Sequence, residues 1–328
     1  MTLPYNSVLV TGAAGCIGAQ VVANLIQKGM RPVVFDLSED RRRLNLVVNK
    51  KDADNVKWVV GDIKEKGILE DVISDNAVST IIHLAALQVP FCNENPLLGA
   101  QVNVIGQINV FEAALKHNID GLAYASSIAA LPPENEKWPA TLYGAFKMVD
   151  EAIANVYWNT KNQPSIGIRP HTVYGPGRDQ GVTAAPTKAM LAAAAGIRFC
   201  IPFSGPIMLQ HTTEVANAFI AAALSKKKGA YVADLAGSNT SVEEVLEIIR
   251  QTIPSAELSS TGEPLPFVSG LNDKYLRSLI GDFPGLGLSI GVEKTISSFK
   301  TLLDKNLVSA DDAYIDPLGK SYYNLYDS

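Results

Sequence analysis

The segment Thr11-Gly12-Ala13-Ala14-Gly15-Cys16-Ile17-Gly18 decides the fold of this chain. It follows a short apolar run at residues 7–10 and opens a helix-like stretch at 17–28 that stops at Gly29. Small residues between a strand and a helix let the backbone approach a pyrophosphate, and the first N–H groups of the helix bind it. The segment therefore predicts a strand–turn–helix unit that cradles a dinucleotide.

Strand and helix patterns alternate through the first half of the chain. Short apolar runs predict further buried strands at 33–35, 56–60, 80–84, 122–125 and 166–168, and helical patterns at 63–73, 96–116 and 143–159 lie between them. Repeated strand–helix units predict an α/β protein with a doubly wound parallel sheet, which is the Rossmann arrangement.

The choice of dinucleotide depends on Asp36, at the end of the second predicted strand and 18 residues after Gly18. A carboxylate there accepts from the ribose hydroxyls of the adenosine and repels a 2′-phosphate, so the sequence predicts NAD rather than NADP. Arg41, Arg42 and Arg43 follow; they could weaken this preference, but we interpret them as the solvated basic start of a helix. After the third strand, Asp62 is placed to bond the adenine amino edge, to cap a helix, or both.

The pattern loosens after Tyr174-Gly175-Pro176-Gly177, where segments shorten and Pro and Gly become frequent. Helices are predicted at 186–195, 213–224, 241–251 and 291–305, with a strand at 230–235. Ser241 and Glu244 form a predicted capping box. We expect an NAD-binding Rossmann domain at 1–175 and a smaller α/β substrate-binding lobe at 176–328, with some segments of the lobe returning to the first domain.

A second motif, Tyr143 and Lys147, lies on a predicted helix. Side chains four residues apart share one helix face, and an ammonium beside a phenol stabilises the phenolate that acts as a general acid–base. Ser126 and Ser127 end the fifth predicted strand, at the sheet edge where such folds bind ligands, and can hold a substrate oxygen. Together with the cradle, these residues predict hydride chemistry on a hydroxyl or a ketone.

The composition excludes several classes of function. The chain has 328 residues, of which 47% are hydrophobic, and a net charge of −5, which gives no basic field for nucleic acid or an anionic membrane. Its three cysteines are interpreted as reduced thiols, and its histidines lack metal-ligand spacing, so we expect no metal, with His83 packed or hydrogen-bonded in the core. No apolar run reaches 18 residues, and we expect a cytoplasmic protein.

These motifs together resemble the extended short-chain dehydrogenase/reductase family, of the NAD-dependent epimerase/dehydratase type. The resemblance covers the first 180 residues in the order of the family and continues weakly through 211–216. Its matching features are the 11–18 loop, Asp36, Asp62-Ile63, Leu84-Ala85-Ala86, Asn103, Ser126-Ser127, the Tyr143/Lys147 pair, Arg169-Pro170 and Val173-Tyr174-Gly175-Pro176.

The resemblance implies a role for each matching residue. Tyr143 would be the acid–base, Lys147 would assist it and hold the nicotinamide ribose, and Ser127 would bond the substrate oxygen, with Ser126 as the alternative. Asn103 would support the local backbone or a water near Lys147. The expected cofactor residues are Gly12, Ala14, Gly15, Cys16, Ile17, Gly18, Asp36, Asp62, Ile63, Leu84, Ala85, Ala86, Asn103, Ser126, Tyr143, Lys147, Pro170, Thr172 and Val173. The resemblance also implies a homodimer formed by the helices at 96–116 and 143–159.

The chain departs from the family where members bind nucleotide-diphosphate sugars. An Arg that usually precedes the segment matching 211–216 is Ile207 here, the stretch 263–270 contains no Arg, and a frequent Asn is Thr172. A diphosphate without cationic partners would lose hydrogen bonds worth about 1.5–3 kcal/mol each. We therefore expect a smaller carbohydrate-like substrate. The residues expected to hold it are Gln88, Ser127, His171 and Arg178, with Thr183 beside them.

Three functions are considered. The first is an NAD-dependent oxidoreductase that transfers hydride at a secondary alcohol or ketone of a sugar or sugar acid, as a dehydrogenase or as an epimerase. The second is a nucleotide-diphosphate-sugar 4-epimerase or dehydratase whose cations lie elsewhere. The third is a non-catalytic NAD-binding protein, which retention of Ser127, Tyr143 and Lys147 disfavours.

Overall fold

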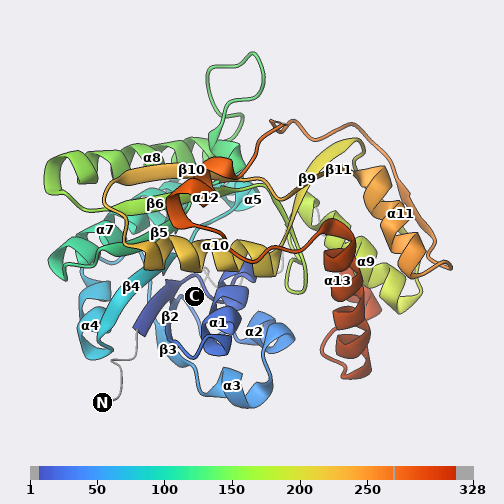
Figure 1. The fold of residues 1–328 in the computed structure, drawn as a ribbon, viewed down its shortest axis with the longest axis horizontal. Helices are drawn as coiled ribbons and strands as arrows, with labels where there is room; N and C mark the ends of the chain where they lie inside the picture. Colours follow the sequence, from blue (N-terminus) through green and yellow to red (C-terminus); the bar gives the residue numbers. More distant parts are fainter. Residues whose placement is uncertain (1–6, 269, 315–328) are drawn as a thin grey trace.

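A parallel sheet forms the centre of the molecule in a computed structural model that describes residues 7–268 and 270–314 (Figure 1). Within these residues seven strands lie in the order β10-β6-β5-β4-β1-β2-β3, and every neighbouring pair is parallel. The strands are β1 Ser7–Thr11, β2 Arg31–Asp36, β3 Lys57–Val60, β4 Val78–His83, β5 Gly121–Ala125, β6 Ser165–Pro170 and β10 Ala230–Leu235. The strand order reverses between β1 and β4, and the crevice there is where such sheets bind ligands.

Helices cover both faces of this sheet because its strands are apolar on both sides. Val8 and Val10 of β1 pack with α1 and α10, whereas Leu9 between them packs with α4, α7 and α8 on the opposite face. The helices of this part are α1 Cys16–Gln27, α2 Arg42–Val47, α3 Lys50–Asp54, α4 Ile68–Asp75, α5 Val89–Glu94, α6 Pro96–Ala100, α7 Gly106–Lys116, α8 Leu142–Lys161, α10 Thr212–Ser225 and α12 Lys274–Ile280.

The second half of the chain contributes to both parts of the molecule. Strand β10 extends the main sheet, and α10 packs against it. The remaining segments gather around a second core at one end of the sheet, where Figure 1 shows α9, α11 and α13 together. These segments are β7 Thr172–Tyr174, α9 Ala185–Ala195, β8 Phe199–Ile201, β9 Pro206–His211, β11 Ser238–Ser241, α11 Val242–Thr252, β12 Leu258–Ser260 and α13 Leu288–Asp304.

The doubly wound parallel sheet predicted from the sequence is confirmed. The helix predicted at 96–116 is three consecutive segments, because a π-helix, η1 Gln101–Ile105, separates α6 from α7. Ser241 caps α11, but its box is not closed: the Glu244 carboxylate accepts from Thr240 Oγ1 instead of the Ser241 N–H. The polar tail beyond residue 314 lies outside the described residues.

Candidate active site

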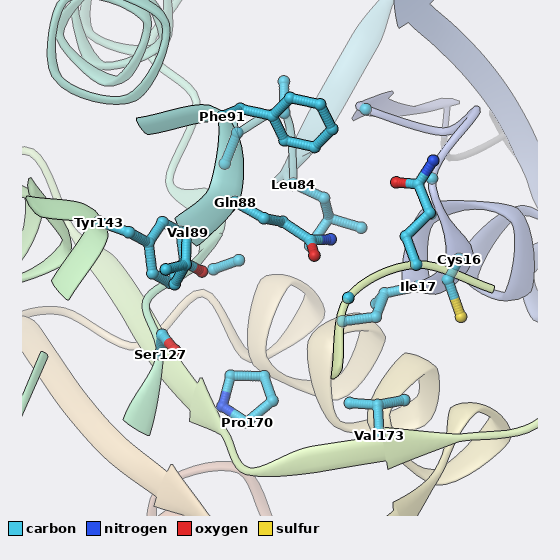
Figure 2. A pocket seen from close by; sticks show the side chains of 18 of the residues that line it. Cys16, Ile17, Leu84, Gln88, Val89, Phe91, Ser127, Tyr143, Pro170 and Val173 are labelled. Carbon is cyan, nitrogen blue, oxygen red and sulfur yellow. The ribbon is translucent and has the colours of Figure 1, made fainter. Parts of the chain in front are cut away.

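A cavity of about 560 Å³ runs along the carboxyl ends of the central strands (Figure 2). Every predicted site residue except Asn103 lines it. The lining therefore includes Gly12, Ala14, Gly15, Cys16, Ile17, Gly18, Asp36, Asp62, Ile63, Leu84, Ala85, Ala86, Gln88, Ser126, Ser127, Tyr143, Lys147, Pro170, His171, Thr172, Val173, Arg178 and Thr183. Residues from 12 to 183 meet here because parallel strands bring their carboxyl ends to the same edge.

The cradle at the start of α1 has space for backbone only. Gly12 has φ +72°, and a Cβ there would lie 2.6 Å from the Ala85 nitrogen. A Cβ at Gly18 would lie 2.3 Å from the carbonyl oxygen of Gly12, so glycine is required for α1 to pack against the loop. Gly15 caps α1 without a side-chain hydrogen bond, which leaves the first N–H groups of the helix to an anion.

Asp36 ends β2 beside this cradle. Its carboxylate accepts from the N–H of Ala14 and of Leu37, each at 2.8 Å. Burial raises the pKa of the Asp36 carboxyl, and the two backbone hydrogen bonds oppose that rise. A carboxylate tied to the cradle and lining the cavity fits the ribose hydroxyls of an adenosine, so the residues present fit NAD.

The expectation of a solvated arginine cluster is wrong for two of its three members. Only Arg42 is solvated, and it pairs with Asp40. Arg41 lies over the Trp58 ring and donates to backbone carbonyls. Arg43 is buried because α2 packs against α1, and this turns its side chain toward the cavity.

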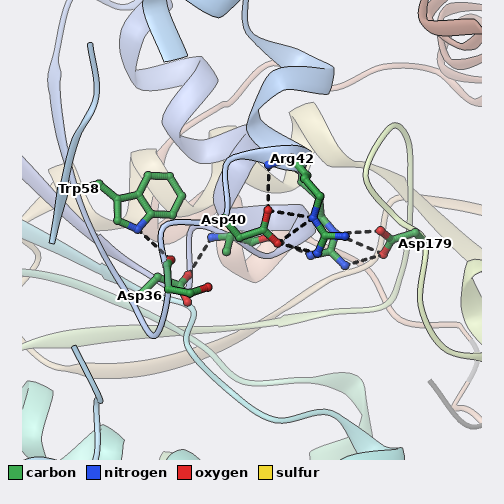
Figure 3. A network of polar contacts seen from close by, with 8 residues as sticks. Asp36, Asp40, Arg42, Trp58 and Asp179 are labelled. Atoms are coloured by element: carbon green, nitrogen blue, oxygen red, sulfur yellow. Dashed lines mark hydrogen bonds and ion pairs between the residues drawn. The ribbon is translucent and has the colours of Figure 1, made fainter. Parts of the chain in front are cut away.

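Arg43 joins the cradle to a distant loop at residues 178–183. It donates to the Ala14 carbonyl at 2.9 Å and forms a bidentate ion pair with Asp179 at 2.8–3.2 Å. Figure 3 shows the polar contacts around Asp36, Asp40, Arg42 and Asp179 in this region. The loop at 178–183 lines the same cavity, so one arginine connects two segments of its wall.

Tyr143 and Lys147 occupy one face of α8, as their spacing predicts. Thr141 caps the helix by accepting from the Gly144 N–H at 3.0 Å, which places Tyr143 in its first turn. The Lys147 ammonium lies 5.9 Å from the centroid of the Tyr143 ring and donates to the Ala125 carbonyl at the end of β5 at 2.8 Å. Both side chains line the cavity.

The two serines after β5 are in different surroundings. Ser126 is buried and donates to the Glu151 carboxylate, which is paired with Arg169. Ser127 accepts from the Ala129 N–H at 3.2 Å, so its hydroxyl proton can be donated elsewhere. Figure 2 shows Ser127 and Tyr143 on the same side of the cavity. Of the two, Ser127 is the better placed to hold a substrate oxygen.

Asn103 is the exception among the predicted cofactor residues, since it does not line the cavity. It is buried in the π-helix, where its Oδ1 accepts from the Leu87 N–H at 2.7 Å and its Nδ2 donates to the Leu87 carbonyl at 3.0 Å. Asn103 therefore supports the backbone just after the Leu84-Ala85-Ala86 turn. The sequence could not separate this supporting role from direct contact with the cofactor, because the same Asn in the same motif is compatible with either role.

His83 is part of the hydrogen-bonded core and forms no metal-binding group with its neighbours among the described residues. His83 is buried at the end of β4, with its Nδ1 2.7 Å from Thr11 Oγ1, and burial lowers its pKa to about 3. This confirms the prediction of a hydrogen-bonded core histidine. The described residues contain no group of three or more His, Cys, Asp or Glu side chains that could hold a metal ion.

The part of the cavity lined by His171, Arg178 and Phe267 mixes apolar and polar side chains. Arg178 Nη2 donates to Thr183 Oγ1 at 2.6 Å, and burial lowers the Arg178 pKa. Its Nε is buried and has no hydrogen-bond partner within the described part of the chain. The His171 ring packs edge-on to Phe267 at 5.5 Å.

Sequence analysis missed several residues that line the cavity. They are Val89, Pro90 and Phe91 on α5, Gln180, Gly181 and Val182 in the loop, and Leu265, Pro266 and Phe267. The α5 residues could have been found, because they come three to five residues after Ala86. Residues 265–267 carry no local signal, since they reach the cavity only through tertiary packing.

The fold and this cavity define a dinucleotide-binding protein of the short-chain dehydrogenase/reductase class. The chain belongs to the NAD dependent epimerase/dehydratase family, whose model matches residues 8–233. Its cofactor is NAD. In the described residues no helix is long and apolar enough to cross a membrane.

Two curated relatives and one solved structure show how much of the chain is matched by known proteins. Protein CapI of Staphylococcus aureus is 30% identical over 182 residues, which are 52% of this chain and 54% of that protein. A UDP-glucose 4-epimerase of Mycolicibacterium smegmatis is 28% identical over 89% of this chain and 98% of its own. The crystal structure of a Thermus thermophilus UDP-glucose 4-epimerase with NAD superposes with a TM-score of 0.73 at 24% identity, covering 90% and 99% of the two chains.

The chain thus spans about half the length of the first curated relatives it matches. The family and the cofactor are established by these comparisons, and the substrate is a separate question.

Proposed function

We propose that this protein is an NAD-dependent oxidoreductase that transfers hydride at a secondary alcohol or ketone of a small, anionic, carbohydrate-like substrate. The observation that carries this proposal is the convergence of Ser127, Tyr143 and Lys147 on one cavity with the nucleotide cradle. Bound NAD supplies the hydride acceptor. Tyr143 takes the hydroxyl proton, Ser127 holds the reacting oxygen, and Lys147 stabilises the phenolate.

The cations around the cavity support a small substrate. The described residues that line it include three Lys or Arg side chains: Arg43, Lys147 and Arg178. Arg43 is bound to Asp179, and Lys147 belongs to the catalytic face. Ile207, at the position of a family arginine, is buried in the second core. This leaves Arg178 to hold an anionic group such as one carboxylate, which is too little for a diphosphate.

A screen of free sugars, sugar acids and nucleotide sugars tests the proposal through NADH absorbance and product stereochemistry. Net NADH formation supports a dehydrogenase, whereas an epimeric product without net absorbance change supports an epimerase with retained cofactor. Absence of both with every sugar and sugar acid would overturn the substrate class.

The second candidate is a nucleotide-diphosphate-sugar 4-epimerase. It is favoured by the Mycolicibacterium smegmatis relative, which carries that activity in its name and aligns over nearly its whole length. Adding UDP in a thermal-unfolding measurement separates the two candidates. A shift with UDP and turnover of a UDP-sugar would replace the small-substrate proposal, and no shift supports it.

Replacing Arg178 with Gln is expected to raise KM for the anionic substrate by about 10- to 150-fold, because a charge-assisted hydrogen bond is worth about 1.5–3 kcal/mol. The expected change in NADH affinity is smaller than threefold. Arg198→Gln is the matched control, since Arg198 is an exposed arginine paired with Glu257 outside the cavity. An unchanged KM in Arg178→Gln would remove Arg178 from the substrate site.

We also propose that the protein forms a homodimer through α8 and the α6–α7 segment. Leu142, Val149 and Val156 are exposed at a seven-residue spacing along α8, and Leu97 and Ile105 are exposed on α6 and η1. Exposed apolar side chains repeated at this spacing form one stripe, which pairs with a second copy.

Val156→Asp is expected to convert a dimer to a monomer, because it places a charged carboxylate on the apolar stripe. Light scattering coupled to size-exclusion chromatography measures the mass. Leu307→Asp is the control, since Leu307 is also exposed but lies away from these helices. A wild-type protein of monomer mass would exclude the proposed dimer.

A further inference from the structure

The proposed catalytic lysine of α8 also belongs to a buried ion pair. The Lys147 ammonium is 3.2 Å from Asp150 Oδ2, and the two side chains are 2% and 0% exposed. Tyr143, Lys147 and Asp150 are spaced by four and three residues, so they follow one another along one face of the helix. None of the roles predicted for the site residues requires a carboxylate at position 150.

The surroundings of Asp150 disfavour a charged carboxylate. Its Oδ1 is buried and has no hydrogen-bond partner in the described part of the chain. Burial raises the pKa of Asp150 to about 6, although the facing Lys147 opposes this rise. A buried ion pair is often no more stabilising than an apolar pair of the same size. Folding alone therefore gives little reason for this carboxylate.

The contacts of Lys147 show what Asp150 does there. An ammonium has three donors, and the Ala125 carbonyl and Asp150 take two of them. The remaining N–H is available on the cavity side, near the Tyr143 ring. Asp150 and Ala125 thus fix the direction in which Lys147 presents its charge.

We propose that Asp150 is a positioning residue: it holds Lys147 at the end of β5 and offsets part of its charge, and so sets the proton affinity of the Tyr143–Lys147 pair. This inference rests on the proposed roles of Tyr143 and Lys147. It assigns the buried carboxylate the task of tuning an acid–base that it does not touch.

Apart from Arg178, the other titratable groups around this pair are neutral or already paired. Burial lowers the pKa of His83 to about 3 and raises that of the Cys92 thiol to about 11. Burial also raises the pKa of the Tyr124 phenol on β5. On the remaining elements, Glu151 is bound to Arg169, and Arg178 faces Tyr143 across the cavity.

Asp150 is therefore the anion that acts most directly on Lys147. Burial by itself would lower the Lys147 pKa, but the facing Asp150, followed by Tyr143, outweighs it and the pKa is raised. Removing the Asp150 charge leaves the Lys147 ammonium without the anion that offsets it, so Lys147 acts on the neighbouring Tyr143 with its full charge. Any titration of the pair then moves to lower pH.

The test uses the protein without substrate, so it does not depend on turnover. The tyrosinate absorbance of each protein near 295 nm is titrated against pH, and the curve of its Tyr143→Phe partner is subtracted to isolate Tyr143. Asp150→Asn is expected to move the midpoint of the difference curve down by about one pH unit or more. Asp150→Glu, which keeps the charge, is expected to bring the midpoint most of the way back to the wild-type value.

Asp234→Asn is the matched control, because Asp234 is another carboxylate near α8 that pairs with Arg169 and not with Lys147. A midpoint shift in Asp150→Asn but not in Asp234→Asn supports the proposal. An unchanged midpoint in a folded Asp150→Asn protein overturns it, even if the thermal stability changes. Should that variant not fold, Asp150→Ser, which leaves room for water beside the ammonium, gives the same comparison.

The outcome is distinguishable from failure of the proposed function. A shifted midpoint in a protein that turns over no substrate would keep the role of Asp150 and remove the oxidoreductase proposal. An active enzyme whose midpoint does not shift in Asp150→Asn would keep the oxidoreductase proposal and remove the role of Asp150.

Discussion

Replacing Tyr143 with Phe is expected to lower the turnover of the substrate by about 10²–10⁴-fold, the usual contribution of a positioned general acid–base. The phenol oxygen is the group that exchanges a proton with the reacting hydroxyl, and Phe keeps the ring but not that oxygen. Initial rates from NADH absorbance, or from product stereochemistry if the cofactor is retained, measure the effect.

The expected loss is specific to turnover. NADH titration of Tyr143→Phe should give a Kd within about threefold of wild type, because the cradle and Asp36 hold most of the cofactor. Tyr157→Phe is the matched control: Tyr157 is on the same helix, but its hydroxyl donates to Glu112 at the surface. A Tyr143→Phe enzyme that retains half of the wild-type rate would remove Tyr143 from the mechanism.

Replacing Gly12 with Ala is expected to abolish NADH binding at concentrations that saturate the wild type and to lower the melting temperature. The added Cβ would lie 2.6–2.7 Å from the backbone atoms of residues 84 and 85, which cannot move without shifting β4. The cradle must then open, and the N-terminus of α1 loses its approach to the pyrophosphate.

Gly29→Ala is the matched control, because it separates the steric clash of the added Cβ from the strain of a positive φ. Gly29 follows α1 with φ +67°, close to the +72° of Gly12, but nothing lies within 4 Å of its added Cβ. It should cost only the backbone strain, about 1–2 kcal/mol, and leave NADH binding intact. Equal NADH affinities of the two variants would show that close approach of the loop to Ala85 is unimportant.

The part of the site that could be predicted from the sequence is the part encoded locally. The cradle, Asp36 and the Tyr143–Lys147 pair each follow from residue spacing within one strand–turn–helix unit or one helix. The parallel sheet follows because apolar runs of strand length alternate with helical patterns. These features depend little on where the rest of the chain lies.

The remaining features arise from contacts between distant segments. Arg43 meets Asp179 across 136 positions, and nothing near either residue indicates the pairing. Ser126 and Ser127 differ only because Glu151, 25 positions after Ser126, accepts from one of them. Asp150 escapes sequence analysis for a different reason: a carboxylate one turn after a lysine is common on exposed helices, and only its burial makes it unusual.

The bridge between Arg43 and Asp179 has a kinetic consequence. Asp179 belongs to the same loop as Arg178, so the contact that holds one wall of the cradle also holds the arginine proposed for the substrate. The position of the cradle and that of the 178–183 loop are therefore coupled through Arg43. We expect ordered binding in which NAD enters before the substrate and leaves after the product, so that the oxidised and reduced cofactor exchange slowly compared with the substrate.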